Sequence, residues 1–146
     1  MRKLFVLAAF LAGCATPPGP PDIPPEKPEP PPVAPAPPPP KENIAVAGLM
    51  ETARADAASG NLANAAASLE RALRIEPRNP RLWHELARVR LKQGQFAQAE
   101  NVAARSNSWA GEDRALRAEN WRLIAESRKA RGDSEGAQKA LDLSTK

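Results

Sequence analysis

The sequence has no tyrosine, one histidine and one cysteine among its 146 residues. A single cysteine excludes an intramolecular disulfide. His84 has no second histidine or free cysteine to accompany it, so we expect no metal site and no cofactor. A glycine-rich phosphate loop, a G-x-S-x-G motif and a carboxylate pair placed in a plausible cleft are also missing. These absences argue against an enzyme, and we expect neither catalytic residues nor a small-molecule substrate.

A large excess of one charge is lacking as well, because the formal net charge is only +4 at pH 7. Removing Arg2 and Lys3 leaves +2, and residues 14–40 carry a net charge of −2, so residues 41–146 carry +4. This balance suits an acidic protein face or a cell-wall polyanion. It is too small to argue for nucleic acid, and we expect no nucleic-acid partner.

The N-terminal apolar run is too short to span a membrane, since residues 4–11 supply only eight apolar positions. Two positive charges precede the run and small residues follow it, which predicts a signal peptide over residues 1–13. Its ending, Leu11-Ala12-Gly13-Cys14, resembles the bacterial lipobox, in which the cysteine thiol is lipidated. The alternative is an ordinary signal peptide with an incidental cysteine, but Cys14 directly follows the two small residues and is the only cysteine.

This resemblance implies a location for the mature protein. In Gram-negative lipoproteins an aspartate after the lipidated cysteine retains the protein in the inner membrane, and here that residue is Ala15. We therefore expect an outer-membrane protein that faces the periplasm and contacts the membrane through its lipid anchor only.

Proline dominates the next segment, with 15 prolines among the 24 residues at 17–40. Such a composition cannot build a core and favours polyproline II, which extends by about 3.1 Å per residue and reaches roughly 75 Å here. We interpret residues 14–40 as the lipidated cysteine and a disordered, proline-rich linker. A spacer of required length is favoured over a passive tether, which would more naturally be rich in glycine and serine.

Residues 41–146 contain a repeating pattern of helix breakers and small side chains. At an interval of 34 residues, Gly60, Ala65 and Ala72 correspond to Gly94, Ala99 and Ser106. Trp83, Leu86 and Ala87 recur 38 residues later as Trp121, Ile124 and Ala125, so four residues are inserted between residues 105 and 117. The spacing and the W-x-x-L-A sequence resemble the tetratricopeptide repeat. This resemblance implies three stacked helical hairpins over residues 44–144.

Helical periodicity predicts an all-α domain, a short solenoid of three hairpins, with helices at 44–58, 62–75, 80–93, 96–107, 113–131 and 134–144. Asn61, Asn79, Asp113 and Asp133 are the expected N-caps, and Gly60, Gly94 and Gly132 are expected to end the first helix of each hairpin. The large residues predicted to fill the space between helices are Leu62, Leu69, Leu73, Leu86, Phe96, Val102, Ile124 and Leu141.

Basic residues form a stripe on the third predicted helix, where Arg81, His84, Arg88 and Lys92 are spaced by three, four and four. The resemblance places this face on the concave groove of the repeats. The predicted partner-binding residues are Arg54, Arg81, His84, Arg88, Lys92, Arg122 and Lys129. We expect a mostly basic groove, because no acid interrupts the four-residue stripe. The alternative is an ordinary solvated helix face.

Two further residues bear on what the domain could bind. Arg88 stands where an asparagine would be expected in a groove that grips a terminal carboxylate, which argues against a carboxylate clamp. Trp109 lies in the segment of the insertion, where core packing is favoured over an exposed interface anchor.

The architecture of lipobox, proline-rich spacer and short tetratricopeptide domain resembles outer-membrane lipoproteins that stimulate a bifunctional, class A penicillin-binding peptidoglycan synthase. The resemblance implies a protein partner and a non-catalytic role in cell-wall synthesis. A pilotin-like assembly chaperone is the alternative, although such proteins usually carry more repeats and no long proline spacer. A generic tetratricopeptide scaffold for an envelope complex is the remaining possibility.

The lipobox interpretation predicts that Cys14→Ser abolishes lipidation and leaves the signal peptide uncleaved by the lipoprotein peptidase. Metabolic labelling with a palmitate analogue measures this directly. Equal label on the wild type and on the variant would overturn the assignment of Cys14.

Overall fold

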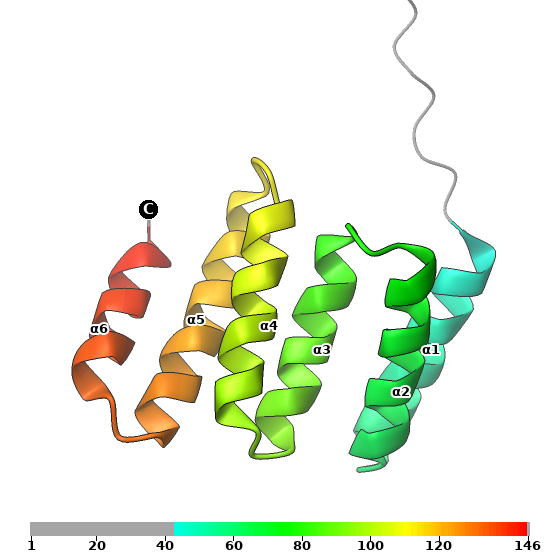
Figure 1. Cartoon of the computed structure of the whole chain (residues 1–146), viewed down its shortest axis with the longest axis horizontal. Helices are drawn as coiled ribbons and strands as arrows, with labels where there is room; N and C mark the ends of the chain where they lie inside the picture. The colour runs from blue at the N-terminus through cyan, green and yellow to red at the C-terminus, as the bar shows by residue number, and fades with distance from the viewer. Residues whose placement is uncertain (1–42, 146) are drawn as a thin grey trace, which may run out of the picture. The chain divides into compact units, whose positions relative to one another are not determined.

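The computed structural model describes residues 43–145, which form six α-helices and contain no strand. Figure 1 shows the helices, which are α1 (Ile44–Ala58), α2 (Leu62–Ile75), α3 (Pro80–Lys92), α4 (Phe96–Trp109), α5 (Arg114–Ala130) and α6 (Ser134–Leu143). The predicted all-α class and the number of helices are therefore confirmed. The predicted signal peptide, the predicted lipidation site Cys14 and the predicted proline-rich linker lie outside the described residues.

Helix ends follow local chemistry. Gly60, Gly94 and Gly132 have φ of +84°, +72° and +86° and lie just beyond α1, α3 and α5, in the left-handed region that glycine adopts without steric cost. Asn79 accepts a hydrogen bond from the Arg81 backbone N–H at 3.0 Å and caps α3. The expected cap at Asn61 is wrong, because its side chain accepts no hydrogen bond from α2.

The four inserted residues add one turn to α5 and leave the loops unchanged. The loop before α3 and the loop before α5 both contain four residues, at 76–79 and 110–113, whereas α3 has 13 residues and α5 has 17. An α-helical turn takes 3.6 residues, so four inserted residues make slightly more than one full turn. The buried residues of α5 therefore face nearly the same direction as the equivalent residues of α3. The predicted end of the fourth helix at 107 is two residues short, because α4 continues through the segment where the repeat pattern lapses.

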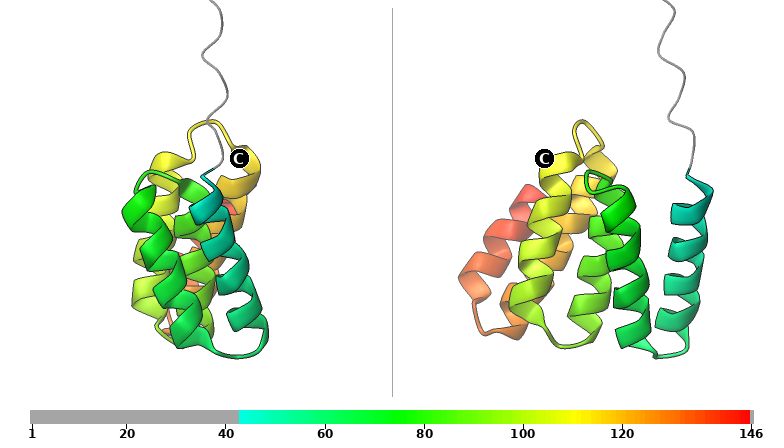
Figure 2. Two further views of the ribbon diagram at one scale, coloured as in Figure 1. Left: turned by 90° about the vertical axis from the view of Figure 1, so that its right-hand side faces the viewer. Right: turned by 45° about the vertical axis from the view of Figure 1, so that its right-hand side comes forward.

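The hairpins stack side by side, and the stacking gives the array two different faces. The first helices of the hairpins, α1, α3 and α5, lie on one side, and α2 and α4 lie on the other (Figures 1 and 2). Each helix packs against the next one along the chain, and α3 also packs against α5.

Small residues fill much of the interior. The larger cluster of buried residues joins α1, α2 and α3 and consists of Val46, Ala53, Ala65, Ala66, Leu69, Ala72, Leu73, Leu82, Leu86 and Val89. The second cluster is mostly alanine and consists of Ala87, Ala103, Ile124, Ala125, Ala137 and Ala140. Alanine lets neighbouring helices approach closely. Because its side chain is only a methyl group, the second cluster buries less apolar area per residue than the first.

One predicted core residue is exposed. Leu141 is 42% accessible, because α6 is the last of the described helices and none of the others covers its outer side. Leu62, Phe96 and Val102 are only partly buried, whereas Leu73 and Leu86 are buried as expected.

Arginines at one repeat position form ion pairs that join successive hairpins. Arg90 on α3 binds Glu70 on α2. Arg128 occupies the same repeat position on α5 and binds Glu100 on α4 at 2.7 Å. Glu100 also binds Arg131 at 2.8 Å, so α4 is tied to both the last turn and the end of α5.

Replacing Leu73 or Leu86 by alanine is expected to lower the free energy of unfolding by about 2–5 kcal/mol, because each leaves a cavity in the larger cluster. Leu141→Ala is the matched control, and we expect a loss below about 1 kcal/mol at this exposed site. Urea unfolding of residues 41–146, which contain both clusters, measures the three values. Similar losses in all three variants would contradict the burial described here.

Candidate functional site

A groove opens between α1 and α3 on the first-helix side of the array, and we call it the α1/α3 groove. Its cavity has a volume of about 260 Å³. Apolar side chains from α1, α2 and α3 line its interior, and charged side chains lie around them. The lining residues are Met50, Ala53, Ala57, Ala58, Leu69 and Val89, with Arg54, Glu85, Arg88 and Lys92. Three of the seven predicted partner-binding residues therefore meet in one cavity.

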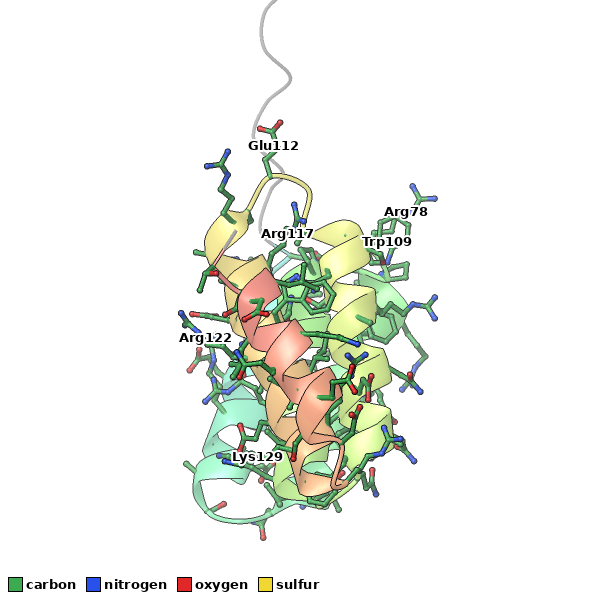
Figure 3. The ribbon with its side chains drawn as sticks, turned by 90° about the vertical axis from the view of Figure 1, so that its left-hand side faces the viewer. Arg78, Trp109, Glu112, Arg117, Arg122 and Lys129 are labelled. Atoms are coloured by element: carbon green, nitrogen blue, oxygen red, sulfur yellow. The ribbon has the colours of Figure 1, made fainter. Side chains whose placement is uncertain are left out.

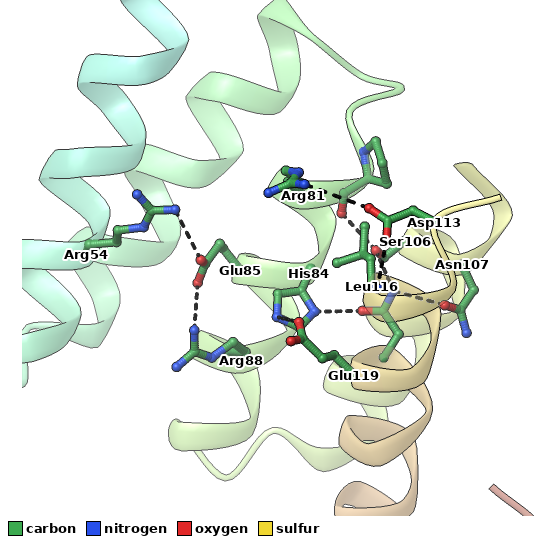
Figure 4. Close-up of polar contacts among 12 residues, drawn as sticks. Arg54, Arg81, His84, Glu85, Arg88, Ser106, Asn107, Asp113, Leu116 and Glu119 are labelled. Carbon is green, nitrogen blue, oxygen red and sulfur yellow. Dashed lines mark hydrogen bonds and ion pairs between the residues drawn. The ribbon is translucent and has the colours of Figure 1, made fainter. Parts of the chain in front are cut away.

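Glu85 adds an acid to the groove, which the four-residue basic stripe did not predict. Its carboxylate lies 3.5 Å from the guanidinium of Arg54 on α1 and 3.4 Å from that of Arg88 on α3 (Figure 4). Glu85 follows His84 directly and is four residues after Arg81, which places it on the same helical face as the stripe. The spacing already contained this signal, because positions three and four residues apart share a face.

Two more members of the stripe have acidic neighbours. Arg81 lies 3.8 Å from Asp113, the N-cap of α5, and His84 Nε2 lies 3.6 Å from the Glu119 carboxylate. Arg81 lines a separate cavity near the start of α1, not the α1/α3 groove. Acidic side chains therefore alternate with the basic stripe, although cations still outnumber acids in the lining of the α1/α3 groove.

His84 occupies an interior position. It is 9% accessible, and Nδ1 lies 2.8 Å from Oδ1 of Asn120 (Figure 4). The Asn120 amide nitrogen donates to Ser106 Oγ at 2.7 Å and to Asn107 Oδ1 at 2.9 Å. Because that nitrogen supplies both donors, Oδ1 is the acceptor and His84 Nδ1 carries a proton. The expected solvent-facing position of His84 is wrong.

The network around Asn120 ties three helices together. Ser106 completes it by donating to the Pro80 carbonyl at the start of α3, at 2.8 Å. Side chains from α3, α4 and α5 thus fix one another in register. Asn120 stands 38 residues after Leu82, so it is a fully buried polar residue at a repeat position that is apolar in the preceding hairpin. Sequence reasoning missed it because the repeat phase predicts burial but not a polar partner.

Positive charge remains on the same side of the array. Lys92, Arg122 and Lys129 are exposed, and none of them makes an ion pair within residues 43–145. Figure 3 shows Arg122 and Lys129 projecting together from the α5 side. They do not line the α1/α3 groove, so they extend the candidate surface beyond it.

Trp109 does not pack into the core as expected. It is 40% accessible at the end of α4, and the Arg78 guanidinium lies over its ring at 5.2 Å from the centroid. Figure 3 shows both residues on the side away from Arg122 and Lys129. The exposed-anchor alternative therefore describes its position, on the face opposite the predicted site.

Residues 43–145 contain no group of histidine, cysteine, aspartate and glutamate side chains that could hold a metal ion. None of the helices in this part of the chain has the length and apolar character needed to cross a membrane.

Comparisons with known proteins agree with the helical array. Residues 56–119 match the tetratricopeptide repeat family. The globular C-terminal domain of P. aeruginosa LpoP is 47% identical, with a TM-score of 0.70, and the match covers 71% of this chain and 98% of that domain. The chain is a tetratricopeptide-repeat protein of the LpoP family. None of the curated protein sequences matches it. The helical-repeat domain is a protein-interaction module, and its partner is a protein.

Removing the Asn120 side chain is expected to destabilise the domain by about 1–3 kcal/mol for each buried polar group left without a partner. Ser127→Ala is the matched control. Ser127 is also fully buried on α5, but its hydroxyl has no hydrogen-bond partner within the described residues, so its loss is expected to be neutral or stabilising. Urea unfolding of Asn120→Ala and Ser127→Ala distinguishes the two cases. An equal loss in both variants would show that the network does not stabilise the fold.

Proposed function

We propose that this protein is an outer-membrane lipoprotein, anchored through Cys14, whose helical domain contacts and stimulates a bifunctional penicillin-binding peptidoglycan synthase. The observation that carries the proposal is the 47% identity over nearly the whole LpoP domain. The lipobox and the proline-rich segment add support, because the synthase-activating lipoproteins that the chain resembles combine these features in the same order.

The α1/α3 groove supplies a plausible binding chemistry. Its lining carries three cationic side chains, Arg54, Arg88 and Lys92, against one carboxylate, that of Glu85. A carboxylate on the synthase can therefore bind Lys92 or share Arg88 with Glu85 without leaving a buried charge unpaired. Met50 and Val89 offer apolar contact beside these charges. The groove thus suits a segment that presents an acid next to an apolar side chain.

A non-catalytic mechanism of stimulation follows from this arrangement. A bound protein activates an enzyme when it binds the active conformation more tightly than the inactive one, and the shift cannot exceed this difference in affinity. The protein would need no reacting group of its own, only a rigid surface. The buried His84–Asn120 network, which sets the register of α3, α4 and α5, supplies such rigidity.

Reversing the charge of Arg88 tests the proposed surface. Its side chain is 51% exposed, so Arg88→Glu is expected to cost less than about 1 kcal/mol of stability. Binding to the synthase is expected to weaken about tenfold or more where the contact is desolvated. Binding is measured by capture of partners from envelope extracts on immobilised residues 41–146, either wild type or variant. Stimulation is measured as the rate of glycan-chain polymerisation by the purified synthase with each protein added.

Arg114→Glu is the matched control, because it makes the same charge change at the exposed start of α5, outside the α1/α3 groove. We expect this variant to bind and stimulate as the wild type does. Capture of a secretin in place of the synthase would support a pilotin. Equal capture and stimulation by Arg88→Glu would exclude the α1/α3 groove as the contact surface.

A further inference from the structure

Residues of α2, α3 and α4 line a second groove, which we call the α2/α4 groove. Helices α2 and α4 lie on the opposite side of the array from α1 and α3 (Figures 1 and 2). The α2/α4 groove has a volume of about 560 Å³, and Pro77, between α2 and α3, also lines it. Leu73, Leu86 and Val102 contribute apolar surface to it. Nothing in the proposed synthase contact involves these residues.

Trp83 presents a preorganised aromatic surface in this groove. Its indole N–H donates to the Pro77 carbonyl at 2.8 Å, which holds the ring in one orientation. The guanidinium of Arg105 lies over the ring at 4.7 Å from the centroid. A guanidinium that stacks on an aromatic ring contacts the ring with its flat face, and its N–H donors point outward in the plane of the group. Within residues 43–145, Arg105 makes no side-chain hydrogen bond or ion pair, so these donors are available to a ligand.

A second arginine–tryptophan pair stands at the same end of this face. Trp109 follows Arg105 by one helical turn on α4, and Arg78 directly follows Pro77. Arg78 covers the Trp109 ring, as Arg105 covers Trp83, and both residues of this pair are exposed. Exposed tryptophan and arginine are the residues most enriched among the energetic centres of protein interfaces.

The charges of the groove are unbalanced. Its lining contains three arginines and one acid, Glu70, and Glu70 is already bound by Arg90. Arg74 and Arg105 have no acidic partner among the residues that the structure describes. Arginine binds carboxylates through two parallel hydrogen bonds, and the apolar lining between the arginines favours an apolar side chain over a bare polyanion.

We propose that the α2/α4 groove is a second protein-binding surface, which takes an acidic peptide segment of a partner with an apolar side chain between its carboxylates. The carboxylates bind Arg105 and Arg74 at the edge, and the apolar side chain lies against Leu73 and Val102. This surface is independent of the α1/α3 groove, so the domain is able to hold two protein segments at once.

Fluorescence anisotropy with labelled model peptides tests this surface on residues 41–146. The probe is a peptide of about 14 residues in which single leucines alternate with pairs of glutamates. One control peptide replaces the glutamates by lysines, and the other replaces the leucines by serines. We expect measurable binding of the first peptide, and binding weaker by about tenfold or more for both controls.

Variants locate the binding. Arg105→Glu is expected to weaken binding of the acidic peptide by about tenfold or more, and Arg105→Gln by a smaller factor. Arg114→Glu, which makes a matched charge change outside both grooves, is expected to leave binding unchanged. Circular dichroism with thermal unfolding checks that each variant is folded.

Four results would overturn the proposal. The first is no binding of the acidic peptide, and the second is equal binding of the serine peptide, which would indicate attraction to any polyanion. The third is an equal loss in Arg105→Glu and Arg114→Glu, which would indicate a response to net charge alone. The fourth is a loss in Arg88→Glu without a loss in Arg105→Glu, which would assign the peptide to the α1/α3 groove.

Discussion

The close approach of helices at alanine positions is the constraint on which this fold depends. No hairpin has enough apolar surface to form a core alone, so stability comes from contacts between successive hairpins. Ala65 and Ala72 are fully buried and leave room for the leucines of the larger cluster. The second cluster is built almost wholly from alanine, and there the hydrogen bonds of Asn120 and the ion pairs of Glu100 supplement the modest apolar burial.

The central helix α3 serves both faces of the array. Glu85 and Arg88 point toward α1, whereas Trp83 and Arg90 point toward α2 and α4, because residues two or five apart lie on different sides of a helix. His84 and Leu86 lie between these sets and are buried. A substitution on one exposed side of α3 can therefore change one groove without altering the other, provided the buried residues remain.

Repeat periodicity and helix breakers predicted the six helices well, since glycine at a left-handed position and asparagine or aspartate caps act locally. The site was predicted less completely. Arg54, Arg88 and Lys92 do meet in one groove, but Glu85 was overlooked on the same face and changes its charge pattern. The phase of the repeat alone could not predict whether His84 and Leu141 are buried or exposed. Burial of His84 requires a polar partner 36 residues away, and exposure of Leu141 follows from the end of the stack.

The order of helix contacts along the chain has a consequence for folding kinetics. Nearly all packing joins consecutive helices, and this low contact order is typical of domains that fold within microseconds to milliseconds. A hairpin can form wherever local propensity is highest and then recruit its neighbours. The hydrogen bond between His84 and Asn120 spans the largest sequence separation of any described side-chain hydrogen bond, 36 residues. We expect this bond to form only when the second and third hairpins dock. An interaction that forms after the transition state for folding slows unfolding more than it speeds folding.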